Sequence, residues 1–385
     1  MAINERLIDT EAAAAAAAVD TDNNLMLDLD ASDVDSYDGD GDEWIDIKDH
    51  EYKPTTNVAQ NFNTVIFDST GVLNSSEEVN GVGFKPDLVW IKARNYAHYN
   101  RLTDSVRGVD KTLRSGQSDS QQSSDYFGAL SFNTDGFNYR DFDESDEELV
   151  AWCFKAGGAA VTDGNGDIDS QVSVNNDLGF SIVKYSGGNS SGTTVGHGLD
   201  VPPELIITKN ISASSSWPVF VTGGIPMGSS TFTLQGSSQY LALNSTTGFI
   251  GYTLDKQFGG SANSGSSSQD IISYCFASKR GVSKVGSYKG TGAAGNKIYT
   301  GFEPAFVMLK NADSSASNSQ WFMWDNQRGE SEYLMANSNS ALGTDAPIQF
   351  HRDGFTVPTV GVINSSGQTH IYYAVAKNTN ETSLI

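Results

Sequence analysis

The sequence is poor in several features that define large classes of protein. It has two cysteines among 385 residues, Cys153 and Cys275, too few for a disulfide scaffold or a four-cysteine zinc site. No apolar run approaches the roughly 18 residues that cross a bilayer. The charged Glu5 and Arg6 also interrupt the N-terminal stretch, so the sequence predicts neither a membrane span nor a signal peptide.

Basic residues are scarce as well. Lysine and arginine number 24 against 47 aspartates and glutamates, which gives a net charge of −23. Phosphate backbones and anionic lipid surfaces repel so acidic a chain, so we expect neither nucleic acid nor membrane as a partner. Proline is rare, with 9 residues, whereas glycine numbers 39 and aromatic residues make up 10%. This balance favours many short strands joined by glycine-containing turns, and therefore a mainly β fold.

The acidity is concentrated at the N-terminus. Residues 1–51 hold 16 carboxylates and two basic residues, a net charge of −14, whereas the rest of the chain carries −9. This shift predicts a boundary near residue 52. The run Ala12–Ala18 predicts a helix over Ile3–Val19, because alanine is the best helix former. Such a helix buries little area, so it either packs against a copy of itself or a larger assembly, or is a frayed tail.

The remainder of the chain repeats one pattern three times, in the same order and with similar gaps. Each copy has a leader strand ending in a glycine turn, a proline followed by an apolar strand, and a closing pair of strands. The leaders are Asn61–Gly71, Gly179–Gly188 and Gly281–Gly292; the proline strands are Lys85–Asn95, Pro202–Asn210 and Glu303–Asn311; the closing pairs are Phe132–Arg140 with Glu148–Ala156, Asn244–Tyr252 with Asp270–Ser278, and Phe350–Pro358 with His370–Asn378. We therefore predict three tandem domains of β-sandwich or jelly-roll type: repeat 1 (57–160), repeat 2 (172–280) and repeat 3 (281–380).

The repeat also predicts which residues lie in the core. The apolar strand that follows Pro86, Pro203 or Pro304 lacks alternation and is expected to be buried on both faces. We place Trp90, Ile207 and Met308 on these buried strands. Cys153 and Cys275 fall at matching positions in the closing strands AWCF and SYCF, so we expect free core thiols and no disulfide.

Taken together, eight segments resemble a family of β-rich virion proteins of tailed phages of marine bacteria, described as tail-fibre or tail structural proteins. The segments are GFKPDLVWIKAR, RLTDSVRG, LSFNTDGFNYR, LVAWCFKAGG, GFSIVKYSGG, VGHGLDVPPELIITKN, YCFASKRGVSKVGSYKGTG and YTGFEPAFVMLK. The acidic opening LDLDASDVDSYDGDGDEWIDI is similar to the start of concanavalin-like (laminin G-like) sandwich domains. The resemblance covers roughly residues 60 to 378 and implies no catalytic residues.

The search for metal and catalytic chemistry gives weak candidates. Asp38, Asp40 and Asp42 have the 1-3-5 spacing of a calcium loop but lack its glycine and its final glutamate, so an acidic turn is the favoured alternative. Asp163, Asn165 and Asp167 repeat the spacing and the defect. The five histidines, at positions 50, 98, 197, 351 and 370, show no metal-ligand pairing. We expect no cofactor and no metal.

Aromatic residues in or beside loops are the candidates for surface recognition. An aromatic face with neighbouring amides and carboxylates suits a sugar ring. The candidates are Tyr96, Tyr99, Trp217, Trp321 and Trp324. The alternative is that the tryptophans begin core strands, because they open the apolar runs WPVFV and WFMW.

Three functions remain open at this stage. The first is a tail fibre or spike subunit on the virion exterior, a homotrimer anchored to other virion proteins by residues 1–51 and presenting β domains to host polysaccharide or protein. The second is a decoration protein on the capsid or at the head–tail junction. The third is a polysaccharide hydrolase, suggested by the carboxylates of Glu43, Asp46, Asp49 and Glu51. We expect a non-enzymatic protein.

Overall fold

The computed structural model describes residues 16–19, 25–29, 58–72, 76–123, 128–140, 146–187, 194–221, 231–233, 239–243, 245, 250–251, 269–358 and 361–377. The chain divides into two units, Met1–Thr55 and Thr56–Ile385. The described residues of the first unit form two antiparallel strands, β1 (Ala16–Val19) and β2 (Leu25–Leu29), which pair Ala16 with Leu29.

The predicted N-terminal helix is therefore wrong over its last four residues. Ala16–Val19 form a strand because they pair with the leucine-rich segment Leu25–Leu29. Intrinsic helix propensity is a weak preference that pairing with another segment overrides. Residues 3–15 of the predicted helix lie outside the described residues.

The second unit is mainly β, as predicted, and its described residues contain one short 3-10 helix, η3 (Val58–Gln60), and no α-helix. In repeat 1 the strands are β3 (Phe62–Asp68), β4 (Ser76–Asn80), β5 (Leu88–Ala93), β6 (Arg101–Asp104), β7 (Lys111–Thr112), β8 (Gln122–Ser123), β9 (Gly128–Asn133), β10 (Gly136–Arg140) and β11 (Glu148–Phe154). Before and in repeat 2 they are β12 (Val161–Asp163), β13 (Ser170–Asn175), β14 (Phe180–Ser186), β15 (Thr194–Gly196), β16 (Leu205–Asn210), β17 (Pro218–Val221), β18 (Thr231–Thr233), β19 (Gln239–Ala242), β20 (Ile250–Gly251) and β21 (Asp270–Phe276). In repeat 3 they are β22 (Ser283–Lys289), β23 (Asn296–Tyr299), β24 (Pro304–Asn311), β25 (Trp321–Asp325), β26 (Leu334–Met335), β27 (Gln349–His351), β28 (Gly354–Val357) and β29 (Thr369–Ala376).

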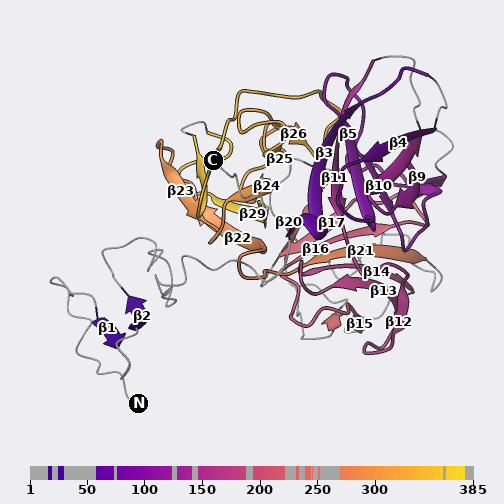
Figure 1. Ribbon diagram of the computed structural model, residues 1–385, viewed down its shortest axis with the longest axis horizontal. Helices are drawn as coiled ribbons and strands as arrows, with labels where there is room; N and C mark the ends of the chain where they lie inside the picture. Colours follow the sequence, from indigo (N-terminus) through magenta and orange to yellow (C-terminus); the bar gives the residue numbers. More distant parts are fainter. Residues whose placement is uncertain are drawn as a thin grey trace. The chain divides into compact units, whose positions relative to one another are not determined.

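The same four-strand order occurs in all three repeats (Figure 1). Leader, closing strand, proline strand and following strand lie side by side as β3-β11-β5-β6, β14-β21-β16-β17 and β22-β29-β24-β25. Pro86 and Pro203 stand two residues before β5 and β16, and Pro304 stands two residues before Phe306, which has the corresponding register. The boundaries of three separate domains stay a prediction, but the sheets follow the predicted features.

A second, smaller sheet packs on the first to make a sandwich. In repeat 1 this sheet is β4-β10-β9, and in repeat 3 it is β23-β28-β27. Phe67 of β3 meets Tyr139 of β10 with ring centroids 5.1 Å apart, and Phe355 meets Tyr372 at 5.4 Å. The glycine of the repeated Asp-Gly-Phe unit is required there, because a Cβ on Gly136 or Gly354 would collide with the backbone of the neighbouring strand.

The core predictions are confirmed. Trp90, Ile207 and Met308 are all less than 5% exposed, on β5, β16 and β24. Cys153 and Cys275 are buried free thiols at matching places in β11 and β21. Burial raises the pKa of both thiols, that of Cys275 to about 12. Such thiols are inert packing residues.

The three repeats share one hydrophobic core. A single cluster of buried side chains includes Phe62 and Phe154 of repeat 1, Phe180 and Phe276 of repeat 2, and Tyr373 of repeat 3. Ring centroids lie 5.3 Å apart for Phe154–Phe180 and 4.7 Å apart for Phe276–Tyr373. The repeats are thus parts of one folding unit, joined through their closing strands.

Hydrogen bonds between repeats close a ring. Asn100, Trp217 and Trp321 occupy equivalent positions, just before or at the start of the fourth strand. The Asn100 amide donates to the Met335 carbonyl in repeat 3, the Trp217 indole donates to the Gln117 carbonyl in repeat 1, and the Trp321 indole donates to the Ala242 carbonyl in repeat 2, each over 2.9 Å. Each repeat therefore donates to one neighbour and accepts from the other.

A second set of contacts follows the same ring but is incomplete. The Tyr274 hydroxyl of repeat 2 donates to Asp104 of repeat 1 over 2.8 Å, and the Trp152 indole of repeat 1 donates to Asp325 of repeat 3 over 2.9 Å. The third equivalent residue is Tyr373, whose buried hydroxyl has no hydrogen-bond partner among the described residues. The corresponding acceptor position in repeat 2 is Val221, which offers no carboxylate.

This difference predicts opposite effects of one chemical change. Tyr274→Phe should lower the free energy of unfolding by about 1–3 kcal/mol, because a buried carboxylate then loses a donor. Tyr373→Phe should leave the stability unchanged or raise it slightly, because it removes a buried hydroxyl that has no hydrogen-bond partner in the described part of the chain. Urea unfolding of both variants tests this, and equal losses would contradict the assignment.

Candidate functional site

Three of the five predicted recognition residues lie in the core. Trp217, Trp321 and Trp324 are all 1% exposed or less. Their indole groups donate to the carbonyls of Gln117, Ala242 and Ala346. The prediction that these tryptophans meet a ligand is therefore wrong. They open strands whose neighbours on both sides bury them, as the apolar runs WPVFV and WFMW indicated.

Tyr96 and Tyr99 lie at the surface, in the loop that joins β5 to β6 (residues 94–100, called the β5–β6 loop below). Tyr96 is 39% exposed and stacks on the imidazole of His98, with ring centroids 6.1 Å apart and planes 21° from parallel. Tyr99 is half-buried beneath the Arg114 guanidinium, 5.9 Å from the ring centroid. These two are the predicted site residues that the fold leaves accessible.

Lys92, the lysine of β5, holds the base of the β5–β6 loop. Its ammonium group is buried and donates to the carbonyls of His98 and, over 3.0 Å, of Asn339 in repeat 3. The Arg94 carbonyl also accepts from the Leu342 amide over 2.8 Å. The loop therefore rests on two repeats at once.

A close contact between a histidine and a buried carboxylate fixes the far side of the loop. The Nδ1 atom of His98 lies 2.5 Å from a carboxylate oxygen of Glu147, whose side chain is fully buried. The negative charge of Glu147 also attracts the protonated Lys92 and partly offsets the lowering of the lysine pKa by burial. The stacked pair of Tyr96 and His98 thus stands on a rigid support.

The other two repeats differ at this place. The positions equivalent to Glu147 are Gln269 and Gln368, whose amides accept from Asn210 and Asn311 over 2.6 and 2.7 Å. In repeat 1 the position of these asparagines is Ala93. Repeat 1 has therefore exchanged an amide pair for a carboxylate with a histidine partner, and only an alignment of the repeats within the sequence could have revealed it.

Lysines equivalent to Lys92 also donate hydrogen bonds to loop carbonyls in the other repeats. Lys209 donates to the carbonyls of Ser118 and Ser215, and Lys310 to Ser319. Burial lowers the pKa of all three lysines to about 7. Three buried ammonium groups at one structural position are a property of the fold, which sequence reasoning missed although each proline strand visibly ends in lysine.

These lysines predict the pH dependence of stability. The unfolded chain keeps its lysines protonated up to about pH 10.5, whereas the folded chain releases those protons above about pH 7. Stability rises with pH wherever the unfolded state binds more protons, so the free energy of unfolding should increase above pH 7. The increase should reverse above pH 10, since burial raises the pKa of Tyr185 and Tyr373 and only the unfolded tyrosines then ionise.

Urea unfolding at a series of pH values measures this slope. Lys310→Met should reduce the rise above pH 7 by about a third, because one of three such groups is removed. The exposed Lys289→Met is the matched control. A pH slope that Lys310→Met leaves intact would contradict the assignment to the buried lysines.

The aspartates with calcium-loop spacing accept hydrogen bonds from protein donors. Asp163 accepts from the backbone and side chain of Asn165 over 2.9 and 2.7 Å. Asp167 accepts from the backbone and hydroxyl of Thr194, which lowers the pKa of that carboxyl. Nowhere in the described ranges do three His, Cys, Asp or Glu side chains gather as metal ligands. Asp38, Asp40 and Asp42 lie outside these ranges, as do Glu43, Asp46, Asp49 and Glu51.

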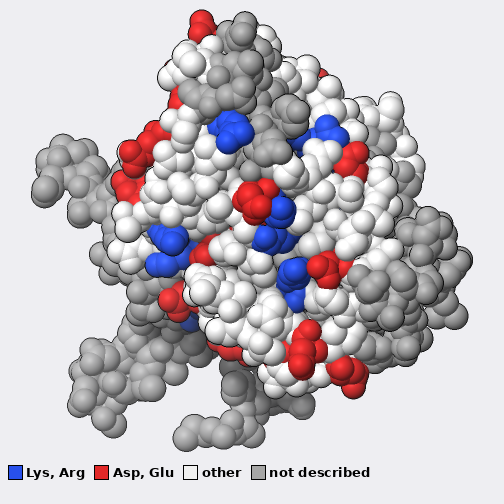
Figure 2. All heavy atoms as spheres, turned by 90° about the vertical axis from the view of Figure 1, so that its right-hand side faces the viewer, with Lys and Arg blue, Asp and Glu red and all other residues white. Residues whose placement is uncertain are grey.

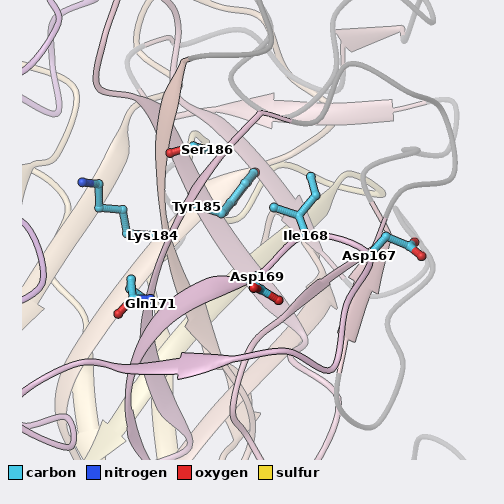
Figure 3. A pocket seen from close by; sticks show the side chains of 7 residues that line it. All are labelled: Asp167, Ile168, Asp169, Gln171, Lys184, Tyr185 and Ser186. Carbon is cyan, nitrogen blue, oxygen red and sulfur yellow. The ribbon is translucent and has the colours of Figure 1, made fainter.

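A surface pocket beside these aspartates lacks converging groups (Figure 3). It is lined by Asp167, Ile168, Asp169, Gln171, Lys184, Tyr185 and Ser186. Figure 3 shows Asp167 and Lys184 at opposite ends. Lys184 forms an ion pair with Asp270 over 3.2 Å.

On the face shown in Figure 2, basic and acidic side chains are interspersed, and neither sign of charge forms a continuous patch. No helix among the described residues is long and apolar enough to cross a membrane.

The described residues define a class: a ring of three β repeats, of which the first presents an accessible aromatic loop. The chain belongs to the family described as "Domain of unknown function (DUF7483)", which matches residues 57–379. The match spans all three repeats, so the complete ring is the unit of the family. Comparison with curated proteins and with solved structures gave no match.

Proposed function

We propose that the chain is a structural protein on the exterior of a phage virion, in the manner of a tail fibre or spike subunit. Residues 1–51 attach it to the particle, and the ring of repeats presents the β5–β6 loop to the host surface. The resemblance of the repeated segments to phage tail proteins supports this function. The charge of −14 on residues 1–51 supports an attachment to a basic surface, because complementary charge steers assembly and sets register.

The observation that carries the recognition part is the construction of the β5–β6 loop. Exposed loops on a rigid β scaffold are common binding sites. Here a partly exposed tyrosine stacks on a histidine that a buried glutamate holds in place. A fixed aromatic face binds a sugar ring or an apolar side chain without a large loss of conformational entropy.

Self-association needs a different basis from the one that the sequence offered. The expected homotrimer rested on a small-residue helix over Ile3–Val19, and Ala16–Val19 form a strand instead. A trimer therefore has no support in the described residues.

Tyr96→Ala should weaken binding of the protein to host cells by about tenfold, the loss typical of a modest interface hot spot. The stability should change by less than about 0.5 kcal/mol, because the ring is a surface group. Val161→Ala is the matched control, since Val161 is an exposed apolar side chain elsewhere. Cell binding by purified labelled protein measures the effect, and equal binding by both variants would exclude the loop.

Deletion of residues 1–51 should leave a folded β protein that is absent from assembled particles. The reason is that the deleted unit is separate from the shared core of Thr56–Ile385. Circular dichroism checks folding, and antibody labelling of particles in electron micrographs checks incorporation. Incorporation of the truncated chain at the level of the full chain would show that the repeats make the attachment.

A further inference from the structure

The β5–β6 loop of repeat 1 lies against a segment of repeat 3, residues 338–342, called the repeat 3 rim below. The Arg94 carbonyl accepts from the Leu342 amide over 2.8 Å, at one end of the loop. At the other end the Asn100 side chain donates to the Ser338 carbonyl over 3.3 Å. The first residue of the loop thus contacts the last residue of the rim, and the two segments run antiparallel.

A buried lysine joins the middles of the two segments. The Lys92 ammonium group donates to the carbonyl of His98 and, over 3.0 Å, to the carbonyl of Asn339. Tyr96 comes two residues before His98, so in an antiparallel arrangement its neighbour on the rim comes one or two residues after Asn339. Ser340 stands at that place, and both Tyr96 and Ser340 are exposed.

The hydroxyl groups of the repeat 3 rim are ordered by each other. The Oγ atoms of Ser338 and Ser340 are hydrogen-bonded over 2.9 Å, and the Ser340 amide donates to the Ser338 Oγ atom over 3.0 Å. A hydroxyl group both donates and accepts hydrogen bonds. A fixed pair of hydroxyls beside an aromatic ring therefore suits a ligand that has an apolar face and hydroxyl groups along its edge.

The charged side chains around the loop are paired with one another. The Arg94 guanidinium lies 3.4 Å from the Glu148 carboxylate and 3.7 Å from the Glu332 carboxylate. The His98 imidazole lies 2.5 Å from the Glu147 carboxylate. An acidic ligand would have to compete for cations that carboxylates already engage, and the half-exposed Glu148 would repel it. This arrangement favours a ligand without charge.

The equivalent loops of the other repeats lack the aromatic part. These loops are residues 211–216 in repeat 2 and residues 312–320 in repeat 3, and neither contains an aromatic residue. The combination of an exposed ring with a hydroxyl-bearing rim is thus specific to the β5–β6 loop among the three.

We propose that Tyr96 and the repeat 3 rim form one binding site for an uncharged saccharide. This inference rests on the proposed function, because it assigns a ligand class and a second repeat to the loop that recognises the host. The apolar face of the sugar ring packs on the Tyr96 ring, and hydroxyl groups at its edge exchange hydrogen bonds with Ser338 and Ser340.

Ser340→Ala tests the contribution of repeat 3 to the site. Loss of one hydrogen bond between uncharged groups should weaken binding of the labelled full chain to host cells by about fivefold. Ser317→Ala makes the same change at an exposed serine of the equivalent loop in repeat 3 and should bind as the wild type does. Circular dichroism checks that both variants are folded.

Polysaccharide extracted from the host cells and separated by anion exchange tests the ligand class. The neutral fraction should inhibit cell binding by the full chain, and the acidic fraction should not. In calorimetry with the neutral fraction, the dissociation constant should change less than about twofold between about 0.05 M and about 0.5 M NaCl, because an uncharged ligand forms no ion pair that salt could screen.

The outcomes separate this inference from the proposed function. If Tyr96→Ala loses cell binding but only the acidic fraction inhibits, or neither fraction does, the loop recognises the host and the ligand class is wrong. If Ser340→Ala binds as well as Ser317→Ala, the repeat 3 rim is not part of the site. If Tyr96→Ala itself binds as the wild type does, the recognition role of the loop is wrong, and this inference with it.

Discussion

The closing strands of the three repeats meet in one aromatic cluster, and the rest of the fold depends on that contact. Phe154 and Phe276 end β11 and β21, and Tyr373 lies in the middle of β29. Their ring centroids lie 4.7 to 6.4 Å from those of rings in neighbouring repeats. Aromatic side chains bury large apolar areas, so this cluster supplies much of the stabilisation that a single sandwich of about one hundred residues would lack. The repeats therefore fold as a ring.

The buried lysines follow from the same geometry. The proline strand of each repeat is interior, so the lysine before its last residue is buried. The ammonium groups of Lys92, Lys209 and Lys310 instead donate to loop carbonyls, two of them across a repeat boundary. Desolvation of these charges is costly, but the hydrogen bonds tie the loops to the ring. Loop position is in this way coupled to core packing.

Departures from the three-fold pattern mark where repeats have taken separate roles. Repeat 1 has Ala93 and Glu147 where the other repeats have an asparagine–glutamine pair. Glu147 contacts His98, and Tyr96 of the β5–β6 loop stacks on that histidine. Val221 stands where the other repeats have an acceptor, and the Tyr373 hydroxyl has no partner within the described ranges. The addition of β13 gives the leader strand of repeat 2 an outer neighbour that β3 and β22 lack among the described residues. Each departure is local, because the shared core tolerates change at the rim and little at the centre.

The sequence by itself determined the β class, the order of the repeated features and the buried strands that carry Trp90, Ile207 and Met308. These follow from local patterns: unbroken apolar runs, turn glycines and a fixed order of segments. The sequence left two interpretations open for Trp217, Trp321 and Trp324, and the tertiary structure decided that they are core residues and that Tyr96 and Tyr99 are not. It also paired Ala16–Val19 as a strand and brought His98 to Glu147. These outcomes depend on contacts between segments that are far apart in the chain. A local pattern of residue types does not show which distant segment packs against a given residue.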